Sequence, residues 1–229
     1  RDEEFRKEQV RHATEVRVDY IQQLLRLLGE SPERVRVVGP EDTSCHGQAP
    51  TSAVVAEGRF LEPVSLFGRG AAARAVTALA AAYGDKSFVL DHASSPLGLV
   101  RIVTHACTAC GNCAAGCPSG ALTLDNRGGR MALEFDASLC IGCNNCAALC
   151  PESRAGAITV TRTTDVSRLS AGPEVIMEDA EVRCATCGAP VASRRMLERL
   201  AAILGAAGNG ARVIEPLCDD CKGIPRAIA

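Results

Sequence analysis

Two cysteine runs of identical spacing are the residues of this chain best suited to chemistry. They hold eight of its thirteen cysteines: Cys107, Cys110, Cys113 and Cys117, then Cys140, Cys143, Cys146 and Cys150. Three cysteines separated by two-residue gaps can surround one face of a cubane, and this spacing is typical of thiolate ligation of [4Fe–4S] clusters. The sequence therefore predicts two such clusters rather than a disulfide scaffold, because disulfide-dense scaffolds are usually short and secreted.

The fourth cysteine of each run is expected to reach the cluster held by the other run. We expect it in the first turn of a following helix, because Pro118 and Pro151 come next and proline suits that position. The predicted ligands of the first cluster are Cys107, Cys110, Cys113 and Cys150, and those of the second are Cys140, Cys143, Cys146 and Cys117.

A third group of thiols follows near the end of the chain. Two Cys-x-x-Cys pairs, Cys184 with Cys187 and Cys218 with Cys221, provide four thiolates for a tetrahedral site. Structural zinc is the expected metal, and iron is the alternative because the same S₄ geometry accepts it. Two unrelated reduced pairs, or a redox-active pair, also remain open. Between the pairs, residues 193–204 have the periodicity of an amphipathic helix.

The remaining motifs are less specific. Cys45 and His46 lie in a polar loop without a second group of ligands nearby, which favours a free or buried spare thiol. Gly68-Arg69-Gly70 precedes a helical pattern, but no acidic partner for a ribose follows at the expected offset, so no nucleotide site is expected.

Composition bounds the class of protein. An apolar content of 47% over 229 residues predicts a folded protein, and with 3% aromatic residues the core is expected to consist of Ala, Val, Leu and Ile. A net charge of −2 argues against a nucleic-acid surface. No apolar run approaches the length of a membrane span. Cysteines that must stay reduced until they bind metal indicate the cytoplasm.

The periodicity of the flanking segments predicts an α+β protein. Residues 1–29 are predicted to be a helix whose stripe, including Tyr20, Leu24 and Leu28, packs within its own domain or docks a partner. An alanine-rich helix follows Gly70, residues 34–38 and 88–90 favour strands, and residues 161–172 are expected to form a polar linker. The expected order is an N-terminal helix (1–30), a small α/β unit (31–98), a two-cluster domain (99–162), and a linker with a zinc-ribbon-like domain (163–229).

Three stretches resemble known families. Residues 99–162 resemble the bacterial-type two-cluster ferredoxin domain, since its two halves align. Residues 101–103 and 133–135 precede the two cysteine runs, and residues 120–124 and 156–160 follow them. The stretch VRVDYIQQLLRLLGESPERVRVV, residues 16–38, resembles the delta subunit of methyl-viologen-reducing hydrogenases, which pass electrons to heterodisulfide reductases. A ferredoxin domain followed by Cys-x-x-Cys pairs is similar to larger bacterial ferredoxin-type proteins that serve enzymes such as formate dehydrogenases.

These observations predict an electron-transfer subunit rather than a self-sufficient enzyme. Four thiolates leave a [4Fe–4S] cluster no open position, which suits one-electron transfer. The resemblances imply catalytic and electron-accepting partner subunits in a redox complex. A freely diffusing ferredoxin, or a regulatory or assembly protein that uses its metals structurally, are the alternatives.

Overall fold

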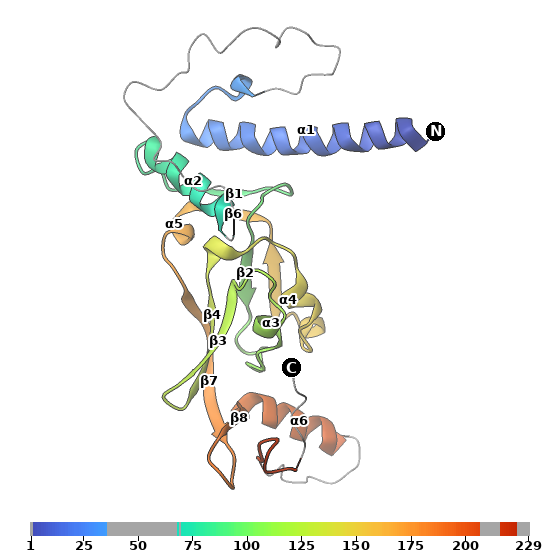
Figure 1. The fold of residues 1–229 in the computed structure, drawn as a ribbon, viewed down its shortest axis with the longest axis vertical. Coiled ribbons are helices and arrows are strands. Elements are labelled where there is room, and N and C mark those ends of the chain that lie inside the picture. The colour runs from blue at the N-terminus through green and yellow to red at the C-terminus, as the bar shows by residue number, and fades with distance from the viewer. Residues whose placement is uncertain (1, 36–67, 69, 207–215, 224–229) are drawn as a thin grey trace. The chain divides into compact units, whose positions relative to one another are not determined.

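The computed structural model describes residues 2–35, 68, 70–206 and 216–223, and these belong to two compact units (Figure 1). The first unit comprises Arg1–Leu99 and Thr161–Ala171, and the second comprises Val100–Val160 and Gly172–Ala229. This division differs from the four consecutive segments expected from the sequence, because the N-terminal helix joins the segment after it and the chain returns to the first unit at residue 161.

The first unit is built from helices and one short pair of strands. Its elements are α1 (Asp2–Leu28), η1 (Pro32–Arg34), α2 (Ala71–Ala82), β1 (Val89–Asp91), β6 (Thr163–Asp165) and α5 (Val166–Leu169). Helix α1 ends as predicted at Gly29, whose φ of 87° is the left-handed conformation that glycine adopts without cost. No helix among the described residues has both the length and the apolarity to cross a bilayer.

The apolar stripe of α1 packs within this unit. Tyr20, Leu24 and Leu28 are buried together with Leu90 of β1. The Tyr20 hydroxyl lies 2.8 Å from Oγ1 of Thr164, which anchors the helix to β6 by a buried hydrogen bond. The buried residues of the stripe therefore pack within their own unit. This is the first of the two roles that the sequence suggested for the helix, the second being docking of a partner.

The prediction of a polar linker over residues 161–172 is wrong. Strand β6 pairs antiparallel with β1, with Thr164 opposite Leu90, and α5 follows it directly. Thr163 and Thr164 are buried, as are Val166 and Leu169. Threonine is polar in composition but favours strands, and its hydroxyl can be buried when it is hydrogen-bonded.

The second unit repeats one pattern of strand, cysteine run, short helix and strand. The first copy is β2 (Leu99–Ile102), α3 (Asn112–Ala115) and β3 (Leu122–Arg127); the second is β4 (Arg130–Phe135), α4 (Asn145–Ala148) and β5 (Ile158–Thr161). Strand β2 pairs with β5, and β3 pairs with β4. The outer strands of the repeat and its inner strands thus form two separate pairs, while the cysteine runs and their helices lie on the connections. Single turns η3 (Ala137–Leu139) and η4 (Ser153–Ala155) complete the second copy.

The inner hairpin is extended into a four-stranded sheet of order β3-β4-β7-β8. Strand β7 (Glu174–Arg183) runs antiparallel to β4 along its first part and to β8 (Pro190–Ser193) at its end. On β4, Met131, Leu133 and Phe135 alternate with less buried residues, and Phe135 is fully buried. Helix α6 (Arg194–Ala206) follows β8 at once and confirms the predicted helix between the two Cys-x-x-Cys pairs.

The helices of the two cysteine runs begin earlier than expected. Cys113 lies within α3 and Cys146 within α4, whereas Cys117 and Cys150 follow these helices. The prediction of a helix starting at each fourth cysteine is therefore wrong. A residue in the left-handed conformation precedes each helix, Gly111 with φ of 80° and Asn144 with φ of 65°. A proline after each fourth cysteine disfavours helical backbone at that cysteine.

Gly111 is required both for its backbone conformation and for space. A Cβ atom at this position would lie 2.7 Å from Cδ2 of Leu124 on β3. We expect Gly111→Ala to cost about 1–2 kcal/mol for the left-handed conformation and more for displacing Leu124. The measurement is thermal denaturation of the metal-loaded protein together with its iron content.

Gly128→Ala is the matched control for that substitution. Gly128 has φ of 63° in the β3–β4 turn, and a Cβ there would meet nothing within 4 Å. It should therefore lose only the conformational part, about 1–2 kcal/mol, and keep its iron. Equal losses in the two variants would show that the Leu124 contact does not matter.

Candidate metal centres

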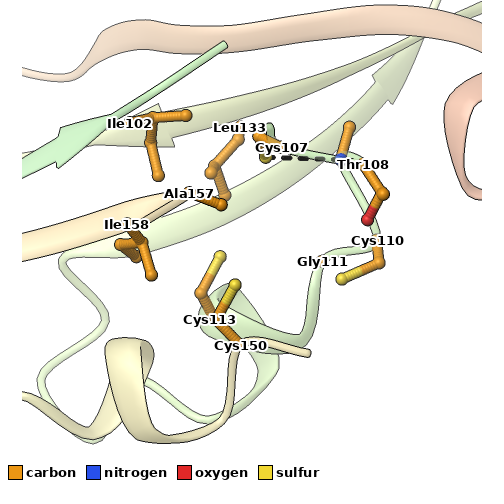
Figure 2. A pocket seen from close by; sticks show the side chains of 11 residues that line it. Ile102, Cys107, Thr108, Cys110, Gly111, Cys113, Leu133, Cys150, Ala157 and Ile158 are labelled. Carbon is orange, nitrogen blue, oxygen red and sulfur yellow. Dashed lines mark hydrogen bonds between the residues drawn. The ribbon is translucent and has the colours of Figure 1, made fainter. Parts of the chain in front are cut away.

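The structure brings cysteines of both runs to one cavity in the second unit (Figure 2). The first cavity is lined by Cys107, Cys110, Cys113 and Cys150. Apolar side chains of β2, β4 and β5, including Ile102, Leu133 and Ile158, form another part of its wall. Counting the part open to solvent, it contains about 370 Å³ of empty space.

A second cavity in the same unit is also lined by four cysteines and by apolar side chains. Its cysteines are Cys117, Cys140, Cys143 and Cys146, and its empty space is about 290 Å³ by the same measure. This cavity is the more open one at its edge, because Cys143 is exposed and Ile141 is 49% exposed. Four cysteine sulfurs at one cavity are the donor set that a [4Fe–4S] cluster requires.

Short helices divide the cysteines between the two cavities. Cys113 lies within α3 and Cys117 follows this helix, and Cys113 lines the first cavity whereas Cys117 lines the second. The second run repeats this arrangement, because Cys146 lines the second cavity and Cys150 the first. Helices α3 and α4 contact each other. The two cavities are therefore adjacent.

Burial opposes ionisation of the central cysteines. It raises the pKa of Cys113 to about 12 and that of Cys146 to about 11. Burial also raises the pKa values of Cys107 and Cys150. Since the thiolate is the ligand form, these sites need a strong cationic partner to be ionised at neutral pH.

Hydrogen bonds to sulfur act in the opposite direction. Burial raises the pKa of Cys117, but backbone N–H groups from Leu122 and Ser119, with the Ser119 hydroxyl, outweigh it and bring the pKa below its ordinary value. At Cys107, the N–H of Ala109 donates to the sulfur at 3.4 Å. Donors of this kind stabilise negative charge on cluster ligands and influence reduction potentials.

The two Cys-x-x-Cys pairs meet at a third site. The sulfurs of Cys184, Cys187, Cys218 and Cys221 all lie within 4.8 Å of one another. Each pair lies in a tight turn with a left-handed glycine after it, Gly188 with φ of 74° and Gly223 with φ of 69°. The N–H of Ala185 donates to the carbonyl of Pro216 at 2.8 Å and joins the two turns.

These four thiols cannot all ionise without a cation. Backbone N–H groups of Cys187 and Cys218 lower the pKa of Cys184 to about 6. Hydrogen bonds to the sulfurs of Cys218, Cys187 and Cys184 raise the pKa of Cys221 to about 12. One thiol of the group is thus more easily ionised than an isolated cysteine and another less easily, and a bound cation would favour the thiolate form of all four.

Sequence reasoning missed the residues from the C-terminal part of the chain that hold the loop of Cys107. Ser193, Arg195 and Asp179 contact one another or the loop of Cys107, although they lie more than 70 residues after it. No local motif marks them, because their partners come from tertiary contact. Cys45 and His46, together with most of the predicted strand at 34–38, lie outside the described residues.

Comparison with known proteins supports the interpretation of the cysteine runs. Residues 106–155 match a family model described as a 4Fe-4S dicluster domain. No curated protein matches the chain. The α+β fold of the second unit, its cysteine-lined cavities and this match together establish that the chain carries an iron–sulfur domain of ferredoxin type.

Proposed function

We propose that this chain is an electron-relay subunit of a larger oxidoreductase complex, with one [4Fe–4S] cluster in each of the two cavities and one zinc ion at the third site. The observation that carries the proposal is the division of eight cysteines into two adjacent groups of four, with each group drawing one member from the other run. The match to a dicluster domain over residues 106–155 supports the same conclusion.

The proposed ligands follow this division. Cys107, Cys110, Cys113 and Cys150 hold the first cluster, and Cys140, Cys143, Cys146 and Cys117 hold the second. When bound, such a cluster supplies a one-electron couple without an open coordination position. The cysteines bind and insulate it, while the apolar wall of the first cavity limits access of water.

Adjacency of the two sites supports transfer between them. Cys113 and Cys146 belong to different sites, yet the charge of Cys146 contributes to the raised pKa of Cys113. Cys113 lies in α3 and Cys146 lies in α4, and these two helices contact each other. An electron on one site therefore has a short path to the other.

The lining residues also argue against substrate chemistry in the cavities. Apart from cysteine, the polar side chains among them are Thr108 in the first cavity, and Ser119 and Asn144 in the second. Such a lining offers no carboxylate or imidazole for general acid–base catalysis. The lining of these two cavities therefore favours electron transfer over acid–base catalysis.

Zinc at the third site serves a structural role in this proposal. Four thiolates complete a tetrahedral shell and leave no position for substrate. Iron in the same shell is the alternative, and metal analysis of the purified protein distinguishes them. The two cysteine turns, together with β8 and α6, which lie between them in sequence, are called the Cys₄ module below.

Membership in a complex is supported by what lies beyond the ferredoxin-type domain. A diffusing shuttle needs little more than its clusters, whereas this chain adds a whole first unit and the Cys₄ module. The resemblances at residues 16–38 and across the cysteine motifs favour a hydrogenase, heterodisulfide-reductase or formate-dehydrogenase type of complex in the cytoplasm.

Copurification of a catalytic subunit from native extract tests this, and a monomeric native mass would favour a free ferredoxin. Clusters that pass electrons to no acceptor would favour a regulatory or assembly role.

The crossed ligand sets predict which cluster a substitution damages. Cys117→Ala should remove the cluster held mainly by residues 140–146 and lower the iron content from about eight to about four per chain. Iron analysis and electron paramagnetic resonance of the anaerobically reduced protein measure this outcome.

Cys45→Ala is the control, because it removes the one cysteine that belongs to none of the three groups, and it should keep both signals. Loss of the cluster bound by Cys107, Cys110 and Cys113 in the Cys117→Ala variant would overturn the crossed assignment. Far fewer than about eight irons in the wild-type protein would overturn the proposal itself.

The third site predicts separate behaviour of zinc and iron. Cys184→Ser should release zinc and destabilise the module around it by several kcal/mol, because structural zinc contributes its binding free energy to folding. The iron content should stay near that of the wild type. Measurements of both metals, with limited proteolysis of the C-terminal region, check this, and loss of iron along with zinc would contradict a separate structural site.

A further inference from the structure

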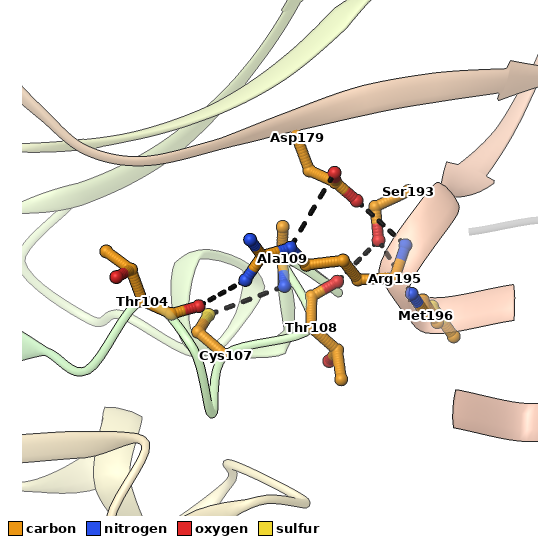
Figure 3. Close-up of polar contacts among 8 residues, drawn as sticks. All are labelled: Thr104, Cys107, Thr108, Ala109, Asp179, Ser193, Arg195 and Met196. Atoms are coloured by element: carbon orange, nitrogen blue, oxygen red, sulfur yellow. Dashed lines mark hydrogen bonds and ion pairs between the residues drawn. The ribbon is translucent and has the colours of Figure 1, made fainter. Parts of the chain in front are cut away.

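The start of α6 is attached to the loop that carries Cys107 (Figure 3). The hydroxyl of Ser193 donates a hydrogen bond to the carbonyl of Thr108, and the guanidinium of Arg195 donates one to the carbonyl of Thr104. These two carbonyls lie on either side of Cys107 in sequence. The loop is therefore held at two points by residues of the Cys₄ module.

The side chains that make these bonds are themselves fixed. Ser193 is fully buried and accepts the N–H of Met196 at 3.2 Å, as the N-cap of the helix. Asp179 of β7 accepts the N–H of Arg195 at 2.8 Å, and its carboxylate lies 3.9 Å from the Arg195 guanidinium. The positive charge of Arg195 is thus held in one place by partners on a strand and on the loop.

A second arginine of the same helix reaches the other part of the first ligand set. Arg199, one helical turn after Arg195, forms an ion pair with Glu152 at 2.8 Å. Glu152 follows Cys150 by two residues, and its side chain is only 13% exposed. Helix α6 therefore contacts both segments of the chain that supply cysteines to the first cavity.

The charge of Arg195 lies close enough to influence one ligand of the first cavity. Burial raises the pKa of the Cys107 thiol, and the Arg195 charge is among the influences that oppose this rise by favouring the thiolate. At the second cavity, Cys143 is exposed and Ile141 is 49% exposed. The second cavity is thus open to water at its edge, while a fixed positive charge lies near the first.

We propose that α6 positions the loop of the first cluster and that the fixed charge of Arg195 raises the reduction potential of that cluster above the value it would have without this charge. This inference rests on the proposed function, since it requires both clusters. Reduction adds one negative charge to the site, and a guanidinium held nearby stabilises the reduced form.

Removal of this charge should lower the potential of the first cluster selectively. In the full chain, we expect Arg195→Gln to decrease the reduced-to-oxidised ratio of the first cluster at a fixed potential by roughly three- to tenfold, where tenfold corresponds to about 59 mV for one electron. The measurement is an anaerobic redox titration followed by electron paramagnetic resonance. The Cys117→Ala background, which should retain the first cluster alone, assigns the signal.

Two further variants separate charge from position. Arg194→Gln removes the same charge from the neighbouring exposed residue of α6 and should leave both potentials unchanged. Arg195→Lys keeps the charge but lacks the planar fork, and should restore most of the wild-type potential. If Arg195→Gln instead loses the first cluster while Arg195→Lys keeps it, the positioning role is supported.

The proposal is overturned if Arg195→Gln and Arg194→Gln change the reduction potential of the first cluster equally. It is also overturned if neither substitution changes this potential in a protein that binds both clusters. A wild-type protein that lacks two cluster signals would instead refute the proposed function, so the two failures are distinguishable.

Discussion

The concentration of negative charge on gathered cysteine sulfurs is the constraint on which the second unit depends. Burial raises the pKa of Cys113 to about 12 and that of Cys146 to about 11, so ionised ligands at these positions need a cationic group beside them. Helices of four residues, such as α3 and α4, are too short to be stable alone. These two helices therefore depend on the packing around them and on any metal group that their sulfurs bind.

The same constraint explains why the fold around the sites is built of turns. A thiolate ligand must approach its metal together with backbone N–H groups that point at sulfur. Left-handed residues before α3 and α4, and glycines after both Cys-x-x-Cys turns, provide this curvature. The regular strands beyond them contribute the apolar wall, with Leu133 of β4 contacting the first cavity and lying 1% exposed.

The parts of the structure that sequence predicted well are those set by local spacing. The gaps between cysteines determine which sulfurs can meet, α1 ends just before Gly29, and α2 lies between Gly70 and Gly84. Local reasoning failed where a distant partner decides the structure. Thr164 looked like part of a linker, yet it is fully buried because Tyr20 and Ser95 hydrogen-bond its hydroxyl. The contacts of Arg195 were hidden for the same reason, since a lone arginine on a helix gives no sign of the carbonyl it binds.

Strand β7 has a consequence for how the chain can be divided. Its first seven residues lie along β4, and its last three pair with β8, so a single strand belongs to the iron–sulfur sheet and to the hairpin of the Cys₄ turns. Without β7, the outer backbone groups of β4 would be unpaired, and unpaired strand edges recruit other chains. A fragment that ends before residue 174 would thus keep every cysteine of both runs but would expose β4 as an unpaired edge strand. By pairing with β4, strand β7 thus also protects the ferredoxin-type core from association with other copies through this edge.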